Sequence, residues 1–215
     1  MSIQLTKVDE AALRDGDSVY LNGRGADAYY KADYETALEY YRLAAAMGNV
    51  ESVSNLGYCY MYGRGVEKNM GLAVAYFRLA AERGNPDALY KLGSIYRRGA
   101  DGVEADGQLG VYYYQRALDV IAGQPGADGT LYPSLMLALA KEHLPDGLLE
   151  VDLNLAWQFL ELARQGYESE IAGGAEFYKG ALSEVKRMQQ LPIFLQNLAE
   201  EDEMPLPGAG APRPS

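Results

Sequence analysis

Apolar side chains recur at intervals of three and four residues along most of this chain, which is the spacing of one face of an α-helix. Residues 51–62 carry Leu56 and further apolar residues in this spacing, and residues 70–83 carry Phe77 and Ala80 in the same way. Glycines follow both stretches, and glycine is favoured immediately after the end of a helix. The pattern therefore predicts two consecutive helices joined by a short glycine-containing loop.

The same pattern returns after 36 residues. Two pairs of stretches match: LGYCYMYGRGV at 56–66 with LGSIYRRGADGV at 92–103, and YYRLAAAMGN at 40–49 with YFRLAAERGN at 76–85. Looser copies of the second element start at Tyr113 and Phe159. Because two independent elements keep one period, we predict a series of helix pairs that stack along the chain.

Glycine also occupies one position inside successive predicted helices, at Gly57 and Gly93. A glycine in a helix interior costs about 1 kcal/mol relative to alanine. Its presence at the same repeat position twice predicts that two helices approach closely there, with a tyrosine or phenylalanine ring of the second helix filling the space. Most of the 18 tyrosines are accordingly assigned to packing between helices.

The pattern L-G-x-x-Y-x-x-G-x-G-V followed by A-x-x-Y-F/Y-x-x-A-A-x-x-G-N resembles the Sel-one-like repeat, a relative of the tetratricopeptide repeat. The match is close over residues 50–85 and 86–117, recognisable over 10–49 and degenerate over 130–166. This resemblance implies an all-α protein, a right-handed α/α superhelix (solenoid) of about four helix pairs with a C-terminal capping helix.

On this basis the chain divides into successive segments. We expect an N-terminal lead at 1–9, three repeats at about 10–49, 50–85 and 86–122, a linker at 123–129, a degenerate fourth repeat at 130–167, capping helices at 168–199, and a disordered acidic, Pro/Gly-rich tail at 200–215.

The first repeat departs from the pattern, because Gly16-Asp17 replaces the Leu-Gly pair. In this alignment Tyr20 matches Tyr60, and Gly23 and Gly25 are expected in the turn between two helices.

The fourth repeat departs further. Leu139-Ala140 takes the position of the Leu-Gly pair, which puts His143 in the tyrosine position. After this repeat, residues 168–189 are expected to form one longer helix that covers its exposed side.

Charge and composition narrow the partner class. Hydrophobic residues make up 48% of the chain, which favours a packed core, and 30 acidic against 19 basic residues give a net charge of −11. Binding to nucleic acid or to an anionic membrane normally requires a basic face, so neither is expected as a partner. A basic protein partner is easier to reconcile with this charge. No run approaches 18 apolar residues, no signal peptide is visible, and Cys59 is the only cysteine, so we expect a cytoplasmic protein.

Candidate catalytic residues are few. His143 is the only histidine, so a hydrolytic triad would have to combine it with Cys59 or a serine. We interpret Cys59 as a small apolar helix residue and His143 as a replacement for tyrosine in packing. We therefore predict no catalytic residue.

Metal and cofactor sites have equally weak signals. One cysteine and one histidine do not supply the ligands of a zinc site. The residues Asp101, Glu104 and Asp106 share a glycine-containing loop, but their spacing fits no EF-hand. The segment Gly23–Ala28 matches G-x-G-x-x-A, which binds dinucleotides only between a strand and a helix. We therefore predict no metal and no cofactor.

The remaining candidate is a binding groove, which the Sel-one-like resemblance places on the first helix of each pair. Transferring its positions one by one gives these candidate partner-binding residues: Ser54, Tyr58, Met61, Tyr62, Tyr90, Ser94, Arg97 and Arg98. Tyrosine, methionine and arginine are enriched in protein interfaces, and Arg97 and Arg98 suit a carboxylate. The alternative interpretation is that the tyrosines pack between repeats and both arginines are solvated or paired.

The resulting hypothesis is a non-catalytic scaffold or adaptor that binds a protein or peptide through a concave groove. One alternative is an inhibitor or immunity-type protein that binds a basic enzyme through its acidic outer surface. The others are an enzyme built on the repeats and a self-associating structural protein. No sequence feature identifies the partner.

Overall fold

The computed structural model describes residues 4–124 and 132–194. All regular elements in these two ranges are helices, and the only strand-like pairing within them is an isolated bridge between Ala100 and Val103. The chain divides into two compact units, Met1–Gly126 and Ala127–Ser215. The predicted all-α helical-repeat class is confirmed.

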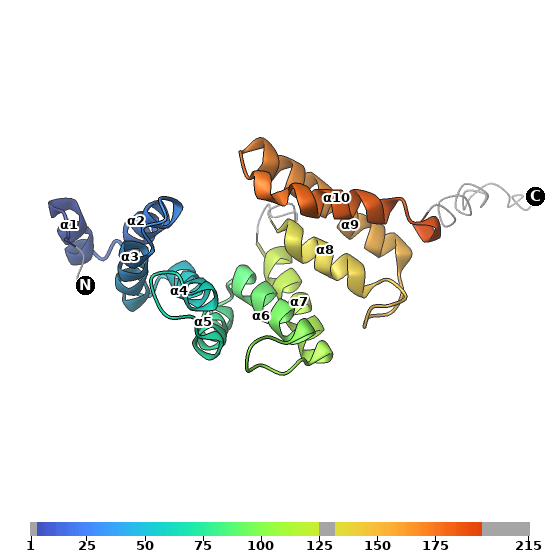
Figure 1. The fold of residues 1–215 in the computed structure, drawn as a ribbon, viewed down its shortest axis with the longest axis horizontal. Coiled ribbons are helices and arrows are strands. Elements are labelled where there is room, and N and C mark those ends of the chain that lie inside the picture. The colour runs from blue at the N-terminus through green and yellow to red at the C-terminus, as the bar shows by residue number, and fades with distance from the viewer. Residues whose placement is uncertain (1–3, 125–131, 195–215) are drawn as a thin grey trace, which may run out of the picture. The chain divides into compact units, whose positions relative to one another are not determined.

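Unit 1 is built from one leading helix and three helix pairs (Figure 1). Its helices are α1 (Lys7–Asp15), α2 (Ser18–Tyr30), α3 (Tyr34–Ala46), α4 (Val50–Tyr62), α5 (Met70–Glu82), α6 (Pro86–Arg98) and α7 (Gly107–Ala122). Each first helix, α2, α4 or α6, packs along the helix that follows it, and α3 and α5 also contact the first helix of the next pair.

The boundaries between helices follow from a repeated glycine–asparagine pair. Gly48 and Gly84 adopt φ values of +89° and +78°, a left-handed conformation that glycine adopts without a steric penalty. The next residues, Asn49 and Asn85, each accept a backbone N–H with the side-chain oxygen and so begin α4 and α6. Pro86 occupies the first turn of α6, where a backbone N–H would have no partner within the helix and its absence costs nothing.

The predicted close approach of helices at glycine is confirmed. A Cβ atom at Gly93 would lie 2.4 Å from the Tyr114 ring, and one at Gly57 would lie 2.7 Å from the Phe77 ring. Both rings are buried and come from the second helix of the same pair. The glycine in the first helix of each pair therefore allows an aromatic ring of the second helix to pack directly against the backbone of the first.

The same contact in the first pair corrects our alignment. Gly25 lies inside α2, where a Cβ would be 2.6 Å from the Tyr41 ring, so Gly25 and not Asp17 corresponds to Gly57. The prediction that Gly23 and Gly25 form a turn is wrong. The actual α2–α3 connection is the three-residue segment 31–33, in which Ala32 takes the left-handed conformation (φ +60°).

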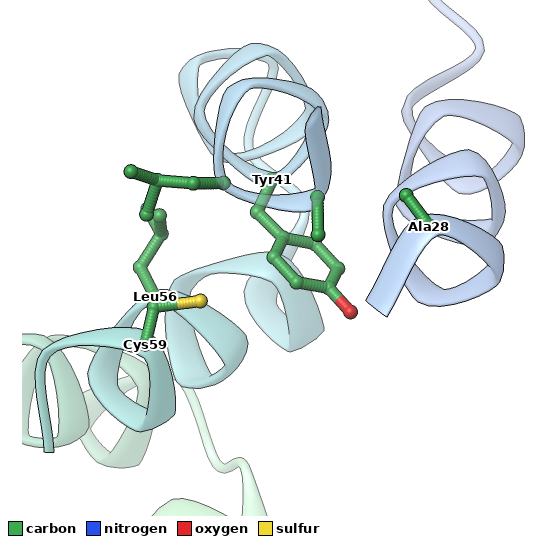
Figure 2. Close-up of a cluster of buried hydrophobic side chains, with 6 residues drawn as sticks. Ala28, Tyr41, Leu56 and Cys59 are labelled. Atoms are coloured by element: carbon green, nitrogen blue, oxygen red, sulfur yellow. The ribbon is translucent and has the colours of Figure 1, made fainter. Parts of the chain in front are cut away.

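Hydrophobic packing joins consecutive pairs. Figure 2 shows Tyr41 between Ala28 of α2 on one side and Leu56 and Cys59 of α4 on the other. Cys59 has no exposed surface, and burial raises the pKa of its thiol to about 11. The thiol is therefore protonated at neutral pH and serves as a small apolar group.

The leading helix α1 overlaps the segment expected to be a lead at 1–9. It begins with a capping box, in which Thr6 and Asp9 satisfy each other's backbone N–H groups. Ala12 of α1 packs with Leu21, Tyr40 and Ala44 in a cluster that closes this end of unit 1.

Unit 2 contains one further pair, α8 (Pro133–Glu142) and α9 (Leu153–Ala172), followed by a 3₁₀ turn (Glu176–Tyr178) and α10 (Lys179–Gln189). The prediction of one helix over 168–189 is wrong, because α9 ends at Ala172. Gly173 and Gly174 interrupt it, and Gly174 has φ +101°. The helix α10 packs on α9 and buries Val185 and Met188.

The fourth pair has different side chains at the two positions of the glycine contact. Ala140 stands in the glycine position, and Leu160 stands where the other pairs have Tyr or Phe; both are fully buried. Four predicted segments lie wholly or partly outside the described residues: 125–129 of the expected linker, 130–131 of the expected fourth repeat, 195–199 of the expected capping helices and the expected tail at 200–215.

Candidate interaction surface

The candidate partner-binding residues lie on one side of α4 and α6. We call this side the first-helix face and define it by Tyr58, Met61, Tyr62, Tyr90, Lys91, Ser94, Arg97 and Arg98. Tyr62 is 53% exposed and Arg98 is also exposed, whereas the others are half-buried. A partner-binding residue must be accessible, and the candidate Ser54 is not, since only 3% of its surface remains exposed.

Tyr58 joins the two helices of this face. Its hydroxyl donates a 2.8 Å hydrogen bond to Asp87 Oδ2 on α6, and its ring meets the edge of Phe77 with centroids 5.2 Å apart. Burial, together with the neighbouring Asp87 carboxylate, raises the pKa of Tyr58. Ser54 Oγ lies 3.5 Å from the same carboxylate oxygen. Tyr58 and Ser54 therefore serve the contact between α4 and α6.

Tyr90 and Ser94 are similarly committed to packing within the third pair. The Tyr90 ring stacks on that of Tyr114, with centroids 6.0 Å apart, and the Tyr114 hydroxyl donates to Ser94 Oγ at 3.2 Å. Both residues thus attach α6 to α7.

Two residues of this region were missed in the sequence, Asp87 and Lys91. The Lys91 ammonium lies 5.2 Å from the Tyr58 ring centroid and 5.1 Å from that of Tyr90. A signal for Asp87 was present, because Glu51 occupies the same position one repeat earlier. Glu51 also accepts a hydrogen bond from the preceding first helix, from Asn22 Nδ2 at 3.2 Å. An acidic residue 36 positions apart in two first turns therefore marks a link between first helices.

The Tyr62 side chain contacts neighbouring residues and remains exposed to solvent. Its ring stacks on Tyr58 with centroids 6.2 Å apart, and the Arg64 guanidinium lies 5.2 Å from its centroid. Arg64 also contacts the Tyr29 and Tyr34 rings of the first pair, at 4.8 and 5.2 Å. These contacts restrict the rotamers of Tyr62 while about half of its surface stays accessible.

The charge of the face changes from one helix to the next. Helix α4 carries no basic residue, and its exposed side chain on this face is Tyr62. Helix α6 carries Lys91, Arg97 and Arg98. The two exposed residues, Tyr62 and Arg98, occupy the same position in successive repeats. The face is therefore aromatic on α4 and cationic on α6.

The residues considered for catalysis have packing roles. The His143 ring stacks on Phe159 with centroids 6.0 Å apart, as Tyr60 does on Tyr76, which confirms its predicted place in the tyrosine position. Its Nδ1 lies 3.0 Å from the Glu150 carbonyl oxygen.

The residues considered for metal and nucleotide binding lie in other settings. Asp101 forms an ion pair with Lys68 at 2.6 Å, and the residues 4–124 and 132–194 hold no group of three side chains arranged for a metal. The segment Gly23–Ala28 lies inside α2, and no strand precedes it in the described chain. Among the helices described, none combines the length and apolarity needed to cross a bilayer.

Comparison with known proteins identifies the repeats. The family model "Sel1 repeat" matches residues 9–49, 50–85, 86–119 and 133–166. No curated protein gave a significant match. A Sel1 repeat protein from Oxalobacter formigenes has a similar fold, with a TM-score of 0.62 and 24% sequence identity over 90% of this chain.

A second solved structure is c5321, a protective antigen of uropathogenic Escherichia coli strains with an SLR fold. It matches with a TM-score of 0.50 and 19% identity over 92% of this chain. The match covers 57% of the Oxalobacter protein and 53% of c5321, so this chain spans little more than half of either. At these identities the likeness concerns the fold.

Proposed function

The chain belongs to the Sel1 repeat family, whose members are generally scaffolds for protein–protein interaction, and we propose that it is a non-catalytic adaptor that binds another protein or a peptide through the first-helix face. The observation that carries this proposal is the pair Tyr62 and Arg98, which stay exposed at equivalent positions while their neighbours are used in packing.

The chemistry of the face supports the proposal. Tyrosine and arginine are the residue types that most often dominate binding energy in interfaces. The stacking of Tyr62 on Tyr58 and its contact with Arg64 order the side chain before a partner arrives. A pre-ordered side chain loses less entropy on binding, which leaves more of the contact energy for affinity.

The alternative functions would depend on features of the chain other than the first-helix face. An inhibitor-type protein would bind a basic partner through acidic residues outside this face, following the net charge of −11. An enzyme would require a reactive group, and the candidates Cys59 and His143 serve in packing. We also propose that the protein is cytoplasmic and that the first-helix face lines a groove.

The test is quantitative affinity purification of the full chain from its native cells. The variant Tyr62→Ala/Arg98→Ala removes the exposed side chains of the face. The matched control is Tyr112→Ala/Arg83→Ala, which removes a 50% exposed tyrosine and an exposed arginine outside the face. We expect a discrete partner with the wild type and the control and its loss with the face variant. Equal recovery of the same partners by both double variants would reject this mode of binding.

A further inference from the structure

The first-helix face has a local charge opposite to that of the whole chain. Three cations, Lys91, Arg97 and Arg98, lie on α6, whereas the net charge is −11. Charges in solution are screened over about 8 Å at physiological ionic strength, so the cations on the face decide which charge a bound segment prefers there. Asp87, the acidic residue of α6, already accepts the Tyr58 hydroxyl.

Arg98 is available for such a segment. It is exposed, and within residues 4–124 and 132–194 it has no ion-pair or hydrogen-bond partner. The Lys91 ammonium lies over the rings of Tyr58 and Tyr90, and it forms no ion pair of 4 Å or less within residues 4–124 and 132–194.

The aromatic and cationic parts of the face lie on neighbouring first helices. The Tyr58–Asp87 hydrogen bond links α4 and α6 through their side chains. One bound segment can therefore contact both parts of the face.

Resting on the proposed function, we infer that the face selects a peptide segment that carries both an apolar or aromatic side chain and a carboxylate. The apolar side chain packs against Tyr62 and the half-buried Met61, and the carboxylate pairs with Arg98. Guanidinium and carboxylate groups form strong paired hydrogen bonds, which makes Arg98 the residue that determines charge preference. A basic segment would be repelled at this face.

The test is selection of peptides from a random library of about twelve residues, displayed on phage, against the immobilised full chain. The same library is selected on Arg98→Glu, on Tyr62→Ala and on the control Arg83→Glu, which makes the same charge change outside the face. We expect wild type and control to enrich peptides that carry both an apolar and an acidic residue at a constant spacing. Arg98→Glu is expected to bind these peptides at least about tenfold more weakly and to select a basic residue at the acidic position.

The outcomes separate this inference from the proposed function. Peptides that depend on Tyr62 but show no acidic residue, or keep their affinity for Arg98→Glu, would refute the acidic chemistry and leave the binding face in place. A selection whose peptides do not depend on Tyr62, or that enriches none, would count against both.

Discussion

The carboxylate of Asp9 accepts a 2.9 Å hydrogen bond from the hydroxyl of Tyr40, and both side chains are buried. The same carboxylate accepts the Tyr20 hydroxyl at 3.2 Å and the Thr6 N–H at 2.8 Å, and it lies 3.2 Å from Arg24 Nε. The Asp9 carboxylate thus links α1 to the first helix pair through hydrogen bonds and an ion pair.

Asp9→Asn should lower the unfolding free energy of unit 1. The amide keeps the shape but removes the charge that Arg24 and the hydroxyl donors face, which typically costs about 1–3 kcal/mol of unfolding free energy. Urea unfolding followed by circular dichroism measures the change. Asp15→Asn, an exposed carboxylate on the same helix, is the control and should change stability little. Equal effects of the two substitutions would mean that the buried network is not stabilising.

The same network predicts a pH dependence. Burial of Asp9 tends to raise its pKa, but the hydrogen bonds from Thr6, Tyr40 and Tyr20 outweigh this effect and hold the pKa at about 2, below the ordinary aspartate value of 3.8. A lowered folded-state pKa gives stability that is present above the unfolded pKa and is lost as pH falls. The difference in unfolding free energy between wild type and Asp9→Asn should therefore be constant near neutral pH and shrink between about pH 4 and pH 2. A difference that stays constant down to about pH 2 would contradict this.

Gly93→Leu should destabilise unit 1, because the new side chain would overlap the Tyr114 ring. Overpacking of this kind costs about 1–3 kcal/mol. Thermal unfolding measures the loss. The control is Gly180→Ala, where an added Cβ meets nothing within 4 Å and stability should hold or rise. An unchanged melting temperature for Gly93→Leu would show that α6 and α7 do not meet closely at this glycine.

The fourth pair has another combination of residues at the positions of this contact. Ala140 takes the place of Gly93 and Leu160 takes the place of Tyr114, so a larger residue at the glycine position occurs together with a smaller residue at the ring position. We therefore expect Gly93→Ala and Tyr114→Leu each to destabilise and the double variant to lose less than the sum. A double-mutant cycle in urea measures the coupling, expected at about 0.5–3 kcal/mol in favour of the double variant. Additive effects would argue against direct contact.

Sequence reasoning succeeded where a contact repeats with the period of the chain. The contacts of Gly57 with Phe77 and of Gly93 with Tyr114 recur in phase, so the helices at 51–62 and 70–83 were predicted nearly to their ends. It failed in the first pair, because the sequence around Gly23 and Gly25 resembles a turn. The contact of Gly25 with the Tyr41 ring, which is visible only in the structure, shows that Gly25 is a packing residue. Sequence reasoning also missed the helix break at 173–174.

The binding face was predictable only in part. Transfer along the 36-residue period found Tyr62 and Arg98, which are exposed. This transfer could not show that Tyr58 and Ser54 are used in contacts between repeats, because their partner Asp87 lies on the next first helix. Exposure depends on such contacts between repeats, and a pattern within one repeat does not contain them.

Site-specific photo-crosslinking tests the binding face most directly. A benzoylphenylalanine residue replaces Tyr62 in the full chain, and in a parallel sample it replaces Tyr112, which is similarly exposed at 50% against 53%. After irradiation in native cells, we predict a discrete crosslinked partner from position 62 and none from position 112. Crosslinks to a discrete partner from position 112 alone, or from neither position, would contradict binding through the first-helix face.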